Sequence, residues 1–145
     1  MIDNLKRCIA LLPVLVAGAA TAEAASPVGT WIDHTGRGAV EITQCGNAMC
    51  GKVVWVKSAA DKEGCNIQVI GNVKPVGAKW DGGWIYDPEK GEKYDVELTP
   101  VGDNKLKVLG YLGMKMFGET MMWTRAPANL DRCDRPASSA AVVAP

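Results

Sequence analysis

Apolar and polar residues alternate along most of the chain between residues 28 and 125. Tyr94, Val96 and Leu98, for example, alternate with Asp95, Glu97 and Thr99, which is the pattern of a strand with one buried face. No long window carries the spacing of an amphipathic helix. The alternation predicts strands at 28–33, 39–44, 51–57, 84–86, 94–99, 106–112 and 119–125. One further strand is expected near 67–70, within the irregular stretch 58–77.

Turn-forming residues separate these strands. Turns are predicted at Trp80–Gly83, Asp87–Gly91 and Pro100–Asn104, because Pro presets φ and Gly accepts a positive φ. Seven or eight short strands at hairpin spacing are typical of all-β folds. This pattern favours a small antiparallel up-and-down barrel or a sandwich, and it does not decide between them.

The first 24 residues have the organisation of a cleaved secretory signal. Lys6 and Arg7 precede an apolar run, Cys8 to Ala20, that is too short to span a bilayer comfortably. Ala22 and Ala24 then supply the small residues that a signal peptidase reads. An anchor helix is the alternative, whereas a lipoprotein anchor is disfavoured because Cys8 follows Lys-Arg. We expect a periplasmic or secreted mature protein.

The mature chain has the size of one domain. The barrel is expected at residues 25–125, and residues 126–145 are rich in Ala, Pro and Ser, which predicts a disordered tail held at most near Cys133. The formal net charge is zero, so binding to nucleic acid is not expected. No further stretch of the mature chain is apolar enough to span a membrane.

Four cysteines remain after the signal is removed: Cys45, Cys50, Cys65 and Cys133. An oxidising compartment favours their pairing, and four cysteines allow three connectivities. A zinc site is disfavoured because His34 is the only histidine and the cysteine spacings are not those of zinc ligands. The CxxC redox motif and the CxxCH haem motif are both absent.

The hairpin around residues 46–49 favours one pairing. If these four residues form its loop, Cys45 faces Cys50, Ile42 faces Val53 and Val40 faces Trp55. Opposed strand residues are close enough for a disulfide. We therefore predict a Cys45–Cys50 disulfide, which leaves Cys65 to pair with Cys133.

Two sets of residues resemble known families. Gly29-Thr30-Trp31 resembles the G-x-W that opens lipocalin-type barrels, in which an Arg of the last strand packs across the Trp; here Arg125 stands at that place. The blocks PVGTW, QCGNAMCGKVVWVK, WDGGWIYDPEKGEKY and GYLGMKMFGETMMWTR resemble the bacterial exported family known as domain of unknown function 2147. This resemblance covers nearly the whole mature domain. It implies an envelope protein with a lipocalin-like barrel, a structural role for Trp31 and Arg125, and no particular reaction.

The aromatic residues suggest a binding site. A subset of them at a barrel mouth would form an apolar pocket with polar tips, although an eight-stranded barrel can also be filled by its own side chains. The candidate ligand-binding residues are Trp55, Trp80, Trp84, Tyr86, Tyr94 and Tyr111.

Two other groups of residues suggest different chemistry. The acidic residues Asp81, Asp87, Glu89, Glu92, Asp95 and Glu97 offer carboxylates for acid–base catalysis, but turn and surface roles explain them equally well. Met114 and Met116, on one face of an expected strand, offer thioethers for Cu(I), alongside Met121 and Met122; such residues also fill irregular cores.

We therefore expect a non-enzymatic envelope protein that binds a small apolar or amphipathic ligand and needs no cofactor. A protein-interaction module without a pocket, docking an envelope partner, is the first alternative. A copper-handling protein that uses the methionines is the second, and a hydrolytic enzyme has the least support.

Overall fold

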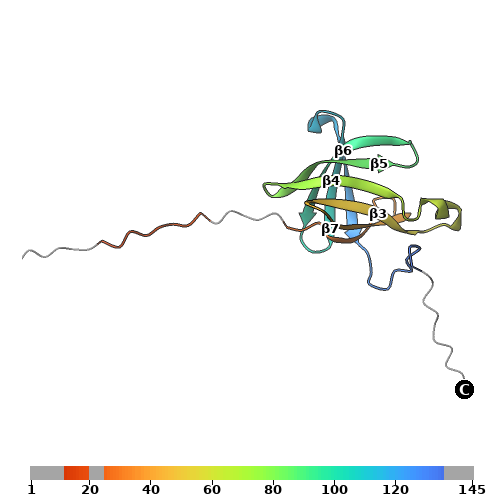
Figure 1. Ribbon diagram of the computed structural model, residues 1–145, viewed down its shortest axis with the longest axis horizontal. Helices are drawn as coiled ribbons and strands as arrows, with labels where there is room; N and C mark the ends of the chain where they lie inside the picture. Colours follow the sequence, from red (N-terminus) through yellow and green to blue (C-terminus); the bar gives the residue numbers. More distant parts are fainter. Residues whose placement is uncertain (1–11, 20–24, 136–145) are drawn as a thin grey trace, which may run out of the picture.

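The computed structural model describes residues 12–19 and 25–135, and within it the chain forms a closed antiparallel barrel (Figure 1). Each strand pairs with the next, and β1 pairs with β8. The predicted up-and-down barrel is therefore confirmed. The strands are β1 (Gly29–Ile32), β2 (Gly38–Cys45), β3 (Ala48–Val56), β4 (Gln68–Val76), β5 (Lys79–Asp87), β6 (Glu92–Val101), β7 (Lys105–Tyr111) and β8 (Glu119–Arg125).

Two short 3-10 helices interrupt the connections between strands. Helix η1 (Ala59–Gly64) lies between β3 and β4, and η2 (Lys115–Phe117) lies between β7 and β8. Across residues 12–19 and 25–135, no helix has the length and apolar character needed to cross a bilayer. The predicted signal segment, 1–24, lies largely outside the described residues.

Alternation decides which side chains fill the barrel. Val96 and Leu98 of β6 are fully buried, as are Leu106 and Val108 of β7, and each pair repeats every second residue. The closed end holds Trp31, which is also fully buried. The Arg125 guanidinium lies 4.2 Å from the centre of the Trp31 ring, as the G-x-W resemblance implies.

Two strands extend further than the sequence indicates. Trp80–Gly83 belongs to β5 and is not a turn, because Asp81-Gly82-Gly83 forms a bulge against β6 with Gly82 at φ +77°. The chain turns instead at Gly77. The Asp-Gly-Gly sequence that predicted a turn forms a β-bulge here, because a turn and a bulge can both require a residue with a positive φ. Strand β4 covers all of 68–76, well beyond the predicted 67–70.

The β2–β3 hairpin corrects the predicted register. Gly46 and Asn47 form a two-residue turn, so Cys45 pairs with Ala48 and Cys50 with Thr43. The predicted four-residue loop was therefore wrong, and the observed strand register differs from the predicted one by two residues. Cys45 and Cys50 are nevertheless diagonal neighbours with Cα atoms 5.8 Å apart, and they form a disulfide.

The shift by two residues keeps the same faces inward, because side chains alternate with a period of two. Ile42 faces Gly51, and Val40 faces Val53. A bulge between Ala39 and Val40 then places Trp55 opposite Ala39.

The tail is attached to the barrel along residues 126–135, where the sequence predicts a disordered tail held at most near Cys133. The Ala126 amide donates to the Thr30 carbonyl, and the Cys133 amide donates to the Val54 carbonyl, both at 2.8 Å. The Cys65–Cys133 disulfide is present and fixes the tail to the segment that follows η1. Residues 136–145 lie outside the described residues.

An ion network holds the end of this segment against β2 and β3. Arg132 donates to Glu41 at 2.5 Å and to Asp134 at 2.7 Å, and Lys52 lies 3.4 Å from Asp134. Hydrogen bonding to Arg132 lowers the pKa of Asp134 to about 2. Glu41 is likewise held below its ordinary pKa by Arg132.

This network predicts acid sensitivity. Asp134 has a lower pKa in the folded protein than in the unfolded chain. Its contribution is therefore complete above about pH 4 and is lost as pH falls through about 2. We expect Asp134→Asn to lower the free energy of unfolding by about 2 kcal/mol at pH 7, with the difference closing towards pH 2. Urea unfolding of both proteins across this range measures the difference, and a gap that does not change with pH would contradict this origin.

Candidate functional site

The barrel encloses a cavity of about 780 Å³ that opens at the end carrying the β1–β2, β3–β4 and β5–β6 connections. Small side chains explain this space. Val40, Val53 and Val69 line the wall, and Gly110 of β7 contributes no side chain at all. Below them, larger residues such as Trp31 and Leu98 fill the closed end. The interior is therefore only partly filled.

The deeper wall of the cavity is apolar. Ile85 of β5 and Met121 of β8 line it, together with Trp123, which is only 4% exposed. The Trp123 indole nitrogen has no hydrogen-bond partner among the described residues. Such an unpaired buried donor is uncommon in a protein interior.

The mouth of the cavity is charged. Arg37, after β1, forms an ion pair with Glu89 of the β5–β6 turn, and Lys90 lies 3.8 Å from Asp87. The mouth also carries acidic residues of η1. The charged and titratable groups lining it are Asp33, His34, Arg37, Asp61, Glu63, Asp87, Glu89, Lys90 and Glu119.

Two of the predicted aromatic residues lie in this cavity. Tyr86 and Tyr94 both line it. The Tyr94 hydroxyl donates to Glu92 at 2.6 Å, and this hydrogen bond raises the pKa of Tyr94 to about 12. Tyr94 therefore stays protonated and presents a polar group beside an apolar wall.

The other four predicted aromatics lie elsewhere. Trp80 packs against the core and donates its indole N–H to the Ala25 carbonyl at 2.8 Å. Trp84 lies against Gly71 and beneath Lys93, whose ammonium is 4.0 Å from the ring centre. Trp55 and Tyr111 are partly buried without lining the cavity.

Sequence reasoning missed Trp123 and Met121 as cavity residues. Both face inward from β8, because Met121 pairs with Val108 and Trp123 with Leu106, and both of these partners are fully buried. The alternation within residues 119–125 places Met121 and Trp123 on the same face of the strand and could have identified them. It was obscured because Met121 was grouped with the neighbouring methionines as a copper candidate.

The methionines do not form the predicted strand face. Met114 precedes η2 and Met116 lies within it, so the expected strand at this place is wrong. Both side chains are exposed. Met121 lines the cavity, whereas Met122 pairs with Lys107 of β7 and is exposed. The β1–β2 connection carries His34 at the cavity mouth.

The acidic residues that were candidates for catalysis do not lie together: Asp87 and Glu89 line the mouth, whereas Asp81 and Glu97 lie on the outside of the barrel. Asp81 and Glu97 both bind Lys115, with the Lys115–Glu97 contact at 2.6 Å. Burial raises the pKa of both carboxyls, but hydrogen bonds from Lys115 and other donors outweigh it, so both pKa values are lowered. Ionised carboxylates on the outer face of a strand do not suit the role of a general acid.

Tyr111 completes this outer network. Its hydroxyl donates to Asp81 at 2.8 Å, and burial with that hydrogen bond raises its pKa to about 12. Tyr111 therefore supports the structure of this network and does not line the cavity.

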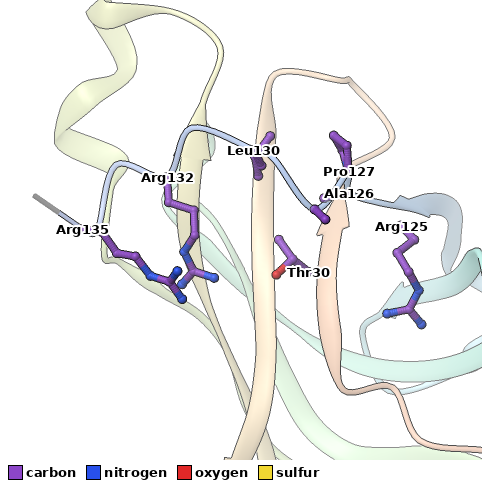
Figure 2. Close-up of a pocket in the computed structure, with 8 residues that line it drawn as sticks. Thr30, Arg125, Ala126, Pro127, Leu130, Arg132 and Arg135 are labelled. Atoms are coloured by element: carbon purple, nitrogen blue, oxygen red, sulfur yellow. The ribbon is translucent and has the colours of Figure 1, made fainter. Parts of the chain in front are cut away.

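A second, smaller cavity of about 270 Å³ lies between the tail and β1. Figure 2 shows Arg132 and Arg135 on one side of it and Arg125 on the other. The Arg132 guanidinium is already occupied by Glu41 and Asp134, and Arg125 donates to the Asp103 carbonyl at 2.6 Å. The arginines do not converge on one position, so the barrel cavity is the stronger candidate site.

Comparisons with known proteins agree with this architecture. The model of a family described as "Uncharacterized protein conserved in bacteria (DUF2147)" matches residues 29–125. A solved Helicobacter pylori structure, "Protein HP1028 from the human pathogen Helicobacter pylori belongs to the lipocalin family", aligns with a TM-score of 0.56 at 16% identity. The alignment covers 70% of this chain and 83% of that one, and it supports the lipocalin-like fold. Among curated proteins, no significant match was found.

Proposed function

We infer that this chain, which belongs to the DUF2147 family of bacterial proteins, is a binding protein that holds a small apolar or amphipathic ligand in its barrel without catalysing a reaction. The observation that carries this proposal is the cavity of about 780 Å³. Ligand sites in proteins range over about 300–1,000 Å³ and combine apolar walls with a few polar groups. The lipocalin-like fold and the two disulfides are consistent with an envelope location.

The chemistry of the wall defines what fits. Val53, Ile85 and Met121 offer no hydrogen bonds, so the deep part of a ligand must be largely apolar. The Trp123 indole N–H is the one unpaired buried donor on this wall within the described residues. Tyr86 and Tyr94 lie nearer the charged mouth, where a polar end can be solvated. An elongated molecule with its apolar end inward satisfies both zones.

A cavity-filling substitution tests this function. Gly110 lines the cavity, and a Cβ at this position would lie 3.8 Å from Met121 and 3.9 Å from Ile85, which is ordinary contact distance. We therefore expect Gly110→Phe to fold, to fill the interior and to weaken binding by about tenfold or more. The probe is N-phenyl-1-naphthylamine, a neutral apolar dye whose fluorescence rises in an apolar site.

The matched control adds the same ring outside the barrel. Thr120 is exposed on β8, and its partner Leu109 neighbours Gly110 on β7. Thr120→Phe should leave dye binding unchanged. Equal binding by wild type and Gly110→Phe would place the dye outside the barrel and remove the support for this function.

A specific surface favours protein interaction as the second candidate. The β7–β8 connection exposes Leu112, Met114, Met116 and Phe117, with Phe117 78% exposed. Lys115 in its centre is bound to Asp81 and Glu97, so the apolar side chains are presented by an anchored turn. Exposed apolar groups of this kind are typical of docking surfaces.

Photo-cross-linking in the native envelope tests this candidate. We expect p-benzoylphenylalanine at position 117 to give one discrete cross-linked species. The same group at Val76, which is 59% exposed at the other end of the barrel, should give none. Identical patterns at both positions would indicate unspecific contact and would count against a docking role for this connection.

A further inference from the structure

The mouth of the cavity has an excess of negative charge, and we propose that it selects ligands with a cationic head group. This inference rests on the binding function proposed above and adds the ligand class. The ligand would be an amphiphile with an amine or a quaternary ammonium group at the end of its apolar body.

The charge balance comes from the side chains at the mouth. The two cations, Arg37 and Lys90, are each paired with a carboxylate, Glu89 and Asp87 respectively. Four more carboxylates line the same mouth: Asp33, Asp61, Glu63 and Glu119. Within the described part of the chain, none of these four forms an ion pair. Six carboxylates and two cations thus line the mouth, which gives its lining side chains a net charge of about −4 with His34 counted as neutral.

The four carboxylates reach the opening from three separate segments of the chain. Asp33 follows β1, Asp61 and Glu63 belong to η1, and Glu119 begins β8. Three segments that are distant in sequence therefore contribute carboxylates to the lining of the mouth. A head group at the mouth would therefore meet negative charge from several directions, and the low-dielectric barrel behind it strengthens this field.

The disulfide supports the arrangement. Cys65 lies directly after η1, and its bond to Cys133 fixes this side of the mouth to the tail. The η1 carboxylates are thus held in position beside the opening. A fatty acid or another anionic amphiphile would bring its own carboxylate into this ring, where like charges repel.

Three probes with the same C12 chain test the selection. Dodecyltrimethylammonium, dodecyl maltoside and dodecyl sulfate are titrated below their critical micelle concentrations, with displacement of N-phenyl-1-naphthylamine as the readout. We expect the cationic probe to bind about tenfold tighter than the anionic one at low salt, and the ratio to shrink in high salt because the interaction is screened. The neutral probe should fall between them.

A pair of charge reversals locates the effect. Asp61→Lys changes the mouth, whereas Asp103→Lys makes the same change in the turn at the closed end of the barrel. Both positions are exposed, so both variants should fold. The first should reduce the cation-to-anion ratio by about threefold or more, and the second should leave it unchanged.

The outcomes separate the two proposals. Binding of all three probes with equal affinity, or tighter binding of dodecyl sulfate, would overturn the charge selection and leave the binding function intact. An equal response of both reversal variants would also overturn it, because the mouth would then have no special part. Binding of no probe, with no dye to displace, would overturn both.

Discussion

We expect removal of the Cys65–Cys133 disulfide, by Cys65→Ser together with Cys133→Ser, to lower the free energy of unfolding by about 4 kcal/mol. This bond joins residues 68 positions apart. Without it, the unfolded chain gains the loop entropy that the bond removes. The folded chain keeps only the contacts of the tail with β1, β2 and β3 to hold the same geometry.

The Cys45–Cys50 disulfide provides the matched control. It joins residues only five positions apart, so the corresponding double serine variant should lose about 2 kcal/mol. Urea unfolding of the two variants and the wild type gives both values. If the short-range variant were the less stable of the two, the chain-entropy explanation would be wrong, and strain or packing at the hairpin would be the cause.

The same removal should also affect the cavity. Cys65 follows η1, which supplies one side of the mouth, and the Cys133 amide is bonded to β3. Releasing this connection frees η1 from the tail. A variant that is destabilised yet binds the dye as the wild type does would show that the disulfide supports the fold and not the site.

The alternation of apolar residues predicted an all-β fold, because the inward positions of strands such as β6 are apolar and the outward ones polar. The choice of a barrel over a sandwich came from the family resemblance. Val96 and Leu98 were identified in this way, Leu106 and Val108 lie within the predicted strand 106–112, and all four are buried. The pattern does not contain the register. A two-residue and a four-residue hairpin loop keep the same faces inward, and only the conformation of Gly46 and Asn47 decides between them.

The site was predicted only in part, for a related reason. Counting aromatic residues does not show which of them face the interior. Tyr86 and Tyr94 line the cavity, but Trp80 occupies the packed core near the N-terminal segment, to which it is hydrogen-bonded. The charged mouth was not predicted at all. It forms only when connections that are far apart in sequence meet at one end of the closed barrel.

The other large effect on stability is expected at the closed end of the barrel. We expect Trp31→Ala to lower the free energy of unfolding by about 4 kcal/mol, in the range for deletion of a buried Trp side chain. Trp31 is fully buried, and its indole N–H donates to the Pro27 carbonyl at 2.9 Å. Its removal leaves a void beneath the Arg125 guanidinium and deprives that carbonyl of its donor.

Trp84→Ala is the matched control, because it deletes the same side chain from the outside of the barrel. Trp84 is only partly buried and contacts Lys93 and Gly71, so about 1 kcal/mol is expected. Equal losses from both substitutions would show that the closed end has no special importance for stability.

The contribution of Arg125 can be separated with a double-mutant cycle. Arg125→Ala alone removes the stacking on Trp31 and the hydrogen bond to the Asp103 carbonyl. Because the stacking needs both side chains, Trp31→Ala combined with Arg125→Ala should cost less than the two single losses together, by about 1 kcal/mol. Additive losses would mean that Arg125 supports the turn at Asp103 and not the ring below it. The closure of the barrel would then depend on Trp31 alone.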